Sequence, residues 1–181
     1  YYKHHETVSL GLARNLAVQM TNSKYLWFLD TDDLWYPNKL KYQYEVMEHN
    51  RDVSLMYCGV NEINESGVHI RDSIPNNDTG NLFPKLLKKF DINMVTPILR
   101  KSKLLEYNLN FDPQMEVSEE YNLFMQIASK QNIISDNNII GKYRVSENSL
   151  TTKKIERWSI ERNITLDNLI ESNSDITKKY S

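Results

Sequence analysis

The chain has 181 residues, of which 40% are hydrophobic and 25% are charged, and its mean hydropathy is -0.60. This length and composition suffice for one globular core. The formal net charge of -2 gives no basic field for nucleic acid, and no run of about 18 apolar residues indicates a membrane span in this stretch. Cys58 is the only cysteine, which excludes an internal disulfide and favours a cytoplasmic location.

The spacing of apolar residues predicts alternating helices and strands. In chain order we expect a helix at 12–20, a strand at 25–29, a helix at 37–49, a strand at 53–63, a turn at 64–67, a loop at 75–80, a helix at 81–89, a strand at 93–99, helices at 101–107 and 118–130, and a strand at 133–144. The pattern leaves open whether the last strand is interrupted at 136–138. The alternation predicts a mixed α/β fold at 1–151, followed by a helical extension at 152–181.

A group of acids follows the apolar run Tyr-Leu-Trp-Phe-Leu at 25–29. Asp30, Asp32 and Asp33 stand where a strand buried on both faces would end, and open parallel sheets bind ligands beyond such strand ends. Crowded carboxylates repel one another unless a cation or hydrogen-bond donors compensate, and oxygen ligands suit Mg²⁺ or Mn²⁺. Taken alone, an ordinary turn is the more frequent explanation, because Asp side chains bond nearby backbone groups.

Motifs on both sides of this junction favour the metal interpretation. Gly-Leu-Ala-Arg-Asn occupies 11–15, and Trp-Tyr-Pro-Asn-Lys-Leu occupies 35–40. Further along, Asn-Phe-Asp-Pro stands at 110–113 and Ser-Glu-Glu-Tyr-Asn-Leu at 118–123. Tyr-Arg-Val at 143–145 and Asn-Ser-Leu-Thr at 148–151 complete the series. In this order the motifs resemble those of the family 2 glycosyltransferases, which implies a GT-A-like mixed sheet flanked by helices.

The resemblance implies a metal-dependent, inverting transfer of a sugar from a nucleotide-sugar donor, with a UDP-sugar favoured, to a glycan or lipid-linked acceptor. Asp32 would hold Mn²⁺ or Mg²⁺ on the donor diphosphate, and Asp30 would contact the nucleotide or a metal-bound water. Asp33 is a third candidate metal ligand. The family's general base corresponds to Glu120, where Glu replaces the usual Asp, and Glu119 is a candidate to compensate for the added methylene.

Two assignments have alternatives that the residues leave open. Glu119 and Glu120 follow Ser118, a potential N-cap, so the two acids are also explained by the positive end of a helix dipole. Arg14 belongs to the motif that lies beside the nucleotide pocket in the resembling enzymes. It is suited equally to a role at the site, where it would hold a phosphate or orient a carboxylate, and to a structural pairing with an acid at the base of the sheet.

The start of the sequence departs from the family pattern, because nothing before Gly11 resembles its first strand and nucleotide-binding turn. We therefore expect a carboxyl-side piece of a longer polypeptide that lacks much of the nucleotide pocket. The segment 82–90, with apolar and lysine residues, is compatible with contact at the inner face of the cell membrane, although a solvated face over a core is the more frequent case. A binding module that keeps the fold without turnover is the competing function.

Overall fold

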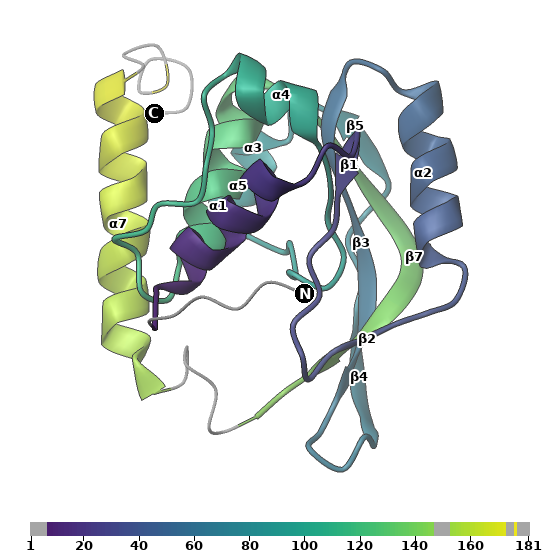
Figure 1. Ribbon diagram of the computed structural model, residues 1–181. Helices are drawn as coiled ribbons and strands as arrows, with labels where there is room; N and C mark the ends of the chain where they lie inside the picture. Colours follow the sequence, from purple (N-terminus) through teal and green to yellow (C-terminus); the bar gives the residue numbers. More distant parts are fainter. Residues whose placement is uncertain (1–6, 147–152, 173–175, 177–181) are drawn as a thin grey trace.

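The computed structural model describes residues 7–146, 153–172 and 176. In this part of the chain a seven-stranded sheet forms the centre, and helices pack on both of its faces (Figure 1). The strands are β1 (Tyr25–Leu26), β2 (Leu34–Trp35), β3 (Val53–Ile63), β4 (His69–Ser73), β5 (Asp78–Gly80), β6 (Ile98–Arg100) and β7 (Asn132–Arg144). The strand order is β1-β6-β3-β7-β2, with β4 paired to β3 and β5 paired to β7. Only β3 and β7 run parallel among these pairs, so the expected mixed sheet is confirmed.

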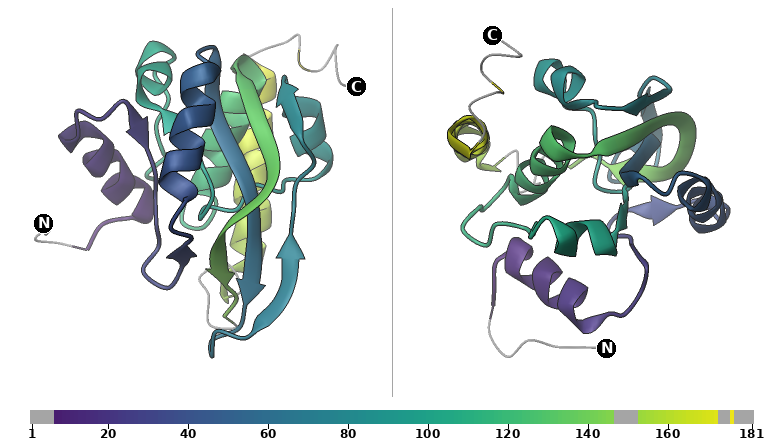
Figure 2. Two further views of the ribbon diagram at one scale, coloured as in Figure 1. Left: turned by 90° about the vertical axis from the view of Figure 1, so that its right-hand side faces the viewer. Right: turned by 90° about the horizontal axis from the view of Figure 1, so that it is seen from above.

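The helices before residue 131 agree with the apolar spacing to within two residues at each end. They are α1 (Leu10–Met20), α2 (Lys39–His49), α3 (Phe83–Lys88), α4 (Lys101–Glu106), α5 (Glu119–Lys130) and α7 (Ile155–Ser172). Figure 2 shows α2 on one side of the sheet, and α5 with α7 beyond it on the other side. The extension predicted at 152–181 thus contains one long helix that packs against α5.

Alternation along β3 supplies a core to each face of the sheet. Leu55 and Tyr57 join the apolar cluster on the α5 side, whereas Met56 and Cys58 join the cluster on the α2 side. Successive side chains of a strand point to opposite faces, which explains why this strand is apolar at nearly every position. The buried Cys58 thiol has its pKa raised to about 12 by desolvation, so it behaves as a small apolar side chain.

The strand predicted at 25–29 is shorter than expected. Only Tyr25 and Leu26 pair, and they run antiparallel to β6. Leu29 is 45% exposed, because residues 27–29 leave the sheet before the acidic turn begins. The expectation of a strand buried on both faces between parallel neighbours is therefore wrong: β1 has a single partner in the described sheet.

The predictions for residues 93–99 and 75–80 need correction, and the question left open at 136–138 is answered. The strand predicted at 93–99 forms only at β6, because Asn93 makes a turn in which its side-chain oxygen accepts the Val95 N–H and its carbonyl accepts the Thr96 N–H. The loop predicted at 75–80 includes β5. In β7, the strand continues through 136–138, but its pairing jumps from Asp136 to Ile139, so the open question is answered by a bulge.

The segment 82–90 turns its apolar side inward. Phe83 and Leu86 are each 1% exposed and belong to the core on the α5 side. These side chains are therefore not available to a membrane surface. The segment is instead a solvated helix over the core, which is the more frequent case for this composition. Among the described helices, none combines the length and the apolar character that crossing a bilayer requires.

Candidate active site

A cavity of about 290 Å³ opens where α1, α5, α7 and the end of β7 meet. Side chains from six separate parts of the sequence line it, and those used below are Arg14, Asp30, Glu119, Glu120, Tyr143 and Arg162. Each of four motifs thus contributes at least one residue to the wall of this cavity: those at 11–15, 30–33, 118–123 and 143–145. Of the six residues predicted from sequence, Arg14, Asp30, Glu119 and Glu120 line the cavity, whereas Asp32 and Asp33 do not.

Arg14 connects the two acidic motifs. Its Nη1 donates to Glu119 Oε1 at 2.5 Å, and its Nη2 donates to Asp30 Oδ1 at 3.1 Å. The guanidinium is buried and lies near the rings of Phe28 and Phe111. Because both ends of its fork are occupied by carboxylates, Arg14 orients acids in this structure, which is one of the two roles that the sequence allowed.

The first motif also fixes α1 on the segment that precedes α5. Asn15 Nδ2 donates to the Phe111 carbonyl at 2.7 Å, and its Oδ1 accepts the Phe111 N–H at 2.9 Å. A Cβ on Gly11 would stand 2.8 Å from the Asp112 carbonyl oxygen, so only glycine permits this approach without a shift. The Gly and Asn of the motif therefore dock the helix that carries Arg14.

The acidic turn distributes its carboxylates in three directions. Asp30 pairs with Arg14, as described. Asp33 is buried, and its Oδ1 accepts the N–H of Arg144 at 2.8 Å. Burial, followed by the charges of Asp32 and Asp30, raises the pKa of Asp33 to about 6 against the lowering effect of that hydrogen bond. The Asp32 side chain is exposed, and within the described residues no hydrogen bond or ion pair engages it.

The assignment of Asp32, with Asp30 and Asp33 as further candidates, as metal ligands stays a prediction, and the structure points the three carboxylates in different directions. In the described part of the chain no three His, Cys, Asp or Glu side chains converge as a ligand set. The exposed carboxylate of Asp32 does fit a narrower role, since Mg²⁺-type sites often use one or two protein carboxylates and complete the shell with water and substrate phosphates. Asp33 instead holds the end of β7 against the turn.

The two glutamates at the start of α5 differ from each other. Glu119 is 2% exposed, and burial raises its pKa while the Arg14 charge lowers it. Glu120 is half-buried at the cavity, and desolvation, assisted by the Glu119 charge, raises its pKa to about 7. Glu119 is thus held by Arg14, whereas Glu120 lines the cavity with a carboxyl group whose pKa lies near neutral pH.

The N-terminus of α5 is held in a way that the sequence did not indicate. Ser118 occupies the N-cap position, but its hydroxyl makes no capping bond. The carboxylate of Glu161 on α7, which is 1% exposed, accepts the backbone N–H groups of Glu116, Val117 and Ser118 at 2.8, 3.0 and 3.1 Å. A single Glu at position 161 carries no motif, so only the packing of α7 on α5 reveals this contact.

The structure describes the first part of the last motif in the series, Tyr-Arg-Val at 143–145. Arg144 donates from Nε to the Asp32 carbonyl at 2.9 Å and from Nη1 to the carbonyls of Asn64 and Glu65. Gly141 allows β2 to pair with β7, because a Cβ there would stand 2.7 Å from the Leu34 carbonyl oxygen. The Asn-Ser-Leu-Thr part of the motif at 148–151 lies outside the described residues.

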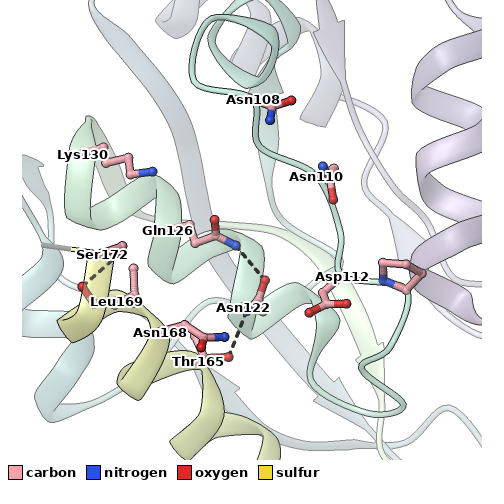
Figure 3. A pocket seen from close by; sticks show the side chains of 11 residues that line it. Asn108, Asn110, Asp112, Asn122, Gln126, Lys130, Thr165, Asn168, Leu169 and Ser172 are labelled. Carbon is pink, nitrogen blue, oxygen red and sulfur yellow. Dashed lines mark hydrogen bonds between the residues drawn. The ribbon is translucent and has the colours of Figure 1, made fainter.

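A second pocket, of about 320 Å³, lies between α5, α7 and the segment around 110–112 (Figure 3). Its lining is polar and includes Asn110, Asp112, Asn122, Gln126, Thr165 and Asn168. Two of these side chains bond each other and the neighbouring helix: Gln126 donates to Asn122 at 2.7 Å, and Asn122 donates to Thr165 at 3.1 Å. None of the residues predicted as site residues lines this pocket.

The mixed sheet with helices on both faces has the GT-A fold, and solved structures share this fold. S. aureus TarS 1–349 in complex with UDP-GlcNAc aligns with a TM-score of 0.61 at 14% identity, covering 82% of this chain and 42% of that chain. Residues 1–109 match the family model for Glycosyl transferase family 2. The chain therefore belongs to glycosyl transferase family 2.

Curated relatives carry the similarity beyond residue 109. The chain is 32% identical over 154 residues to the E. coli UDP-Glc:alpha-D-GlcNAc-diphosphoundecaprenol beta-1,3-glucosyltransferase WfgD, covering 82% of this chain and 58% of that protein. It is 30% identical over 159 residues to an uncharacterized glycosyltransferase of Rickettsia felis, covering 88% of this chain and 26% of that protein. The chain thus spans between a quarter and three fifths of the length of these relatives.

Proposed function

We propose that the protein transfers a sugar from a nucleotide-sugar donor to a glycan or lipid-linked acceptor, with inversion at the anomeric carbon and with Mn²⁺ or Mg²⁺ on the donor diphosphate. The observation that carries this proposal is the double ion pair of Arg14, which sets the acidic turn and the glutamate pair against one cavity. Donor-side and acceptor-side groups of an inverting transferase need such an opposed arrangement.

Within this proposal Asp32 is the protein ligand of the metal. Its carboxylate is exposed and unengaged among the described residues, and a divalent cation there supplies charge neutralisation for the departing diphosphate. Asp30, fixed by Arg14, lies beside the same turn and would contact the nucleotide. The name of WfgD specifies a UDP-Glc donor, and TarS has been solved with UDP-GlcNAc, which supports a UDP-sugar as the donor.

Glu120 is the proposed general base. Its carboxylate takes the proton of the acceptor hydroxyl while the hydroxyl oxygen bonds to the anomeric carbon and the bond from that carbon to the diphosphate oxygen breaks. Glu119 is better suited to positioning, because its carboxylate is already held by Arg14. The half-buried place of Glu120 at the cavity supports this division between the neighbouring acids.

The test is release of nucleoside diphosphate by the full-length parent protein from a panel of sugar nucleotides, with Mn²⁺ or with a chelator. We expect metal-dependent release from one donor, increased by an acceptor and lost in Asp32→Ala. Binding of a donor by the folded protein without release, with any acceptor of the panel, would instead support the non-catalytic binding module.

A further inference from the structure

Arg162 brings a cation from α7 into the cavity that Glu120 lines. It projects from a helix far along the chain, outside the 1–109 segment that matches the family model. Its side chain is half-buried, and it shares the cavity wall with Glu119, Glu120 and Tyr143. No motif in the sequence pointed to this residue, so the structure alone raises the question of what it binds.

Three aromatic rings hold the guanidinium of Arg162. Its Cζ lies 3.7 Å from the ring centroid of Trp158, 4.2 Å from that of Tyr121 and 5.1 Å from that of Phe90. Phe90 and Tyr121 also pack against each other edge to face, with centroids 4.8 Å apart. Stacking of this kind fixes the plane of a guanidinium and leaves its edge of N–H donors free for a ligand.

Among the described residues the N–H donors of Arg162 have no hydrogen-bond acceptor, although its charge interacts with that of Glu120 across the cavity. Its Nε is buried without a hydrogen bond, and no ion pair engages its terminal nitrogens. Other arginines nearby differ: Arg14 pairs with Asp30 and Glu119, and Arg157, one turn earlier on α7, pairs with Glu116 and Glu161. A desolvated cation without a hydrogen-bond acceptor costs free energy, which an anionic ligand would recover.

We propose that Arg162 binds a phosphate group carried by the acceptor, and so selects acceptors in which a phosphate lies close to the attacking hydroxyl. The inference rests on the proposed function, which assigns the donor diphosphate to Asp32, outside the cavity wall, and the acceptor hydroxyl to Glu120, which shares that wall with Arg162. A planar guanidinium fork matches two phosphate oxygens. The acceptor in the name of WfgD carries a diphosphate, which is consistent with this chemistry.

The first test measures binding without activity. The Nε–Hε resonance of Arg162, assigned by its loss in Arg162→Lys, is followed by NMR while inorganic pyrophosphate is added with chelator present. We expect a saturable shift of this resonance and no comparable shift for Arg157, which is the matched control. An unchanged Arg162 resonance, or equal shifts for both arginines, overturns the proposal regardless of whether the protein transfers sugar.

The second test compares two acceptors that differ only in phosphate: GlcNAc-diphosphate-alkyl and GlcNAc-alkyl. For Arg162→Gln we expect KM for the diphosphate acceptor to rise about ten- to hundredfold, with partial rescue in Arg162→Lys, and KM for the donor to stay within about twofold. Arg157→Gln, on the same helix, should leave both acceptors unaffected. An equal loss with both acceptors indicates a structural role for Arg162 and contradicts the proposal.

The two tests separate this inference from the proposed function. If the protein releases no nucleoside diphosphate from any donor, the proposed function fails while the pyrophosphate titration still decides whether Arg162 binds phosphate. If transfer occurs but prefers the neutral acceptor, the function stands and the role of Arg162 is refuted.

Discussion

The acidic turn, which reaches the cavity through Asp30, and the glutamate pair at the start of α5 are built differently. The turn leaves Asp32 exposed and anchors its neighbours through Arg14 and Arg144. The glutamates are enclosed by α1 and α7, and burial raises the pKa of Glu120 to about 7. An exposed carboxylate remains charged and available to a cation, whereas an enclosed one exchanges protons near neutral pH. Under the proposed function, carboxylates thus have two different roles, and the difference in their burial separates these roles.

The largest effect should follow from Glu120→Gln. We expect transfer to fall about a hundred- to ten-thousandfold, because the amide cannot take the acceptor proton, while donor affinity changes little. Turnover with saturating donor and a separate donor-binding titration measure the two quantities. Normal turnover in this variant would remove Glu120 from the role of base. Glu119→Gln, measured beside it, shows whether its neighbour takes that role.

Asp32→Ala should act on the donor side instead. We expect metal-dependent donor affinity to weaken about a hundredfold, since the variant loses the proposed protein ligand for the cation on the diphosphate. Isothermal titration with the donor, with and without Mn²⁺, measures this change. If the affinity is lost equally with and without metal, Asp32 contacts the donor directly and the metal assignment is wrong.

Glu161→Gln tests how α7 supports the glutamate pair. The variant cannot accept all three backbone N–H groups that precede α5, and we expect a loss of about 2–3 kcal/mol in the free energy of unfolding. Urea denaturation measures it, with Glu156→Gln, an exposed site on the same helix, as the control. Equal stability of the two variants would show that α7 does not hold the start of α5.

The pH profile should report the enclosed acid. With the pKa of Glu120 raised from 4.5 to about 7, the fraction of ionised base falls about tenfold between pH 8 and pH 6, and so should turnover. The folded state binds this proton more tightly than the unfolded chain, so this group makes folding less favourable as pH rises from about 4.5 to about 7. A flat profile between pH 6 and pH 8 would contradict the raised pKa.

Asp33→Asn should have the smallest effect and separates Asp33 from Asp32. The amide oxygen can still accept the Arg144 N–H, and removing a carboxylate whose pKa is raised to about 6 should stabilise the fold at pH 8. Donor affinity should stay within about twofold. A loss of affinity like that of Asp32→Ala would restore Asp33 as a metal ligand.

The local sequence predicts most of the helices and strands, but it does not predict which strands pair with one another. The helices follow the apolar spacing, and β3 matches its predicted range, because periodicity along one segment is a local property. The strand at 25–29 is shortened because its pairing depends on β6, which is distant in sequence. The apolar neighbours of Asn93 favour a strand at 93–99, because their pattern does not reveal the side-chain hydrogen bond that bends the chain there.

The sequence by itself determined the family, the order of the motifs and the residue types that face the cavity. Only the tertiary structure decided that Arg14 links Asp30 to Glu119, that Asp33 turns inward, and that Glu161 and Arg162 arrive from α7. The physical reason is that charge and hydrogen-bonding capacity belong to single residues, whereas burial and partners depend on segments that meet only after folding.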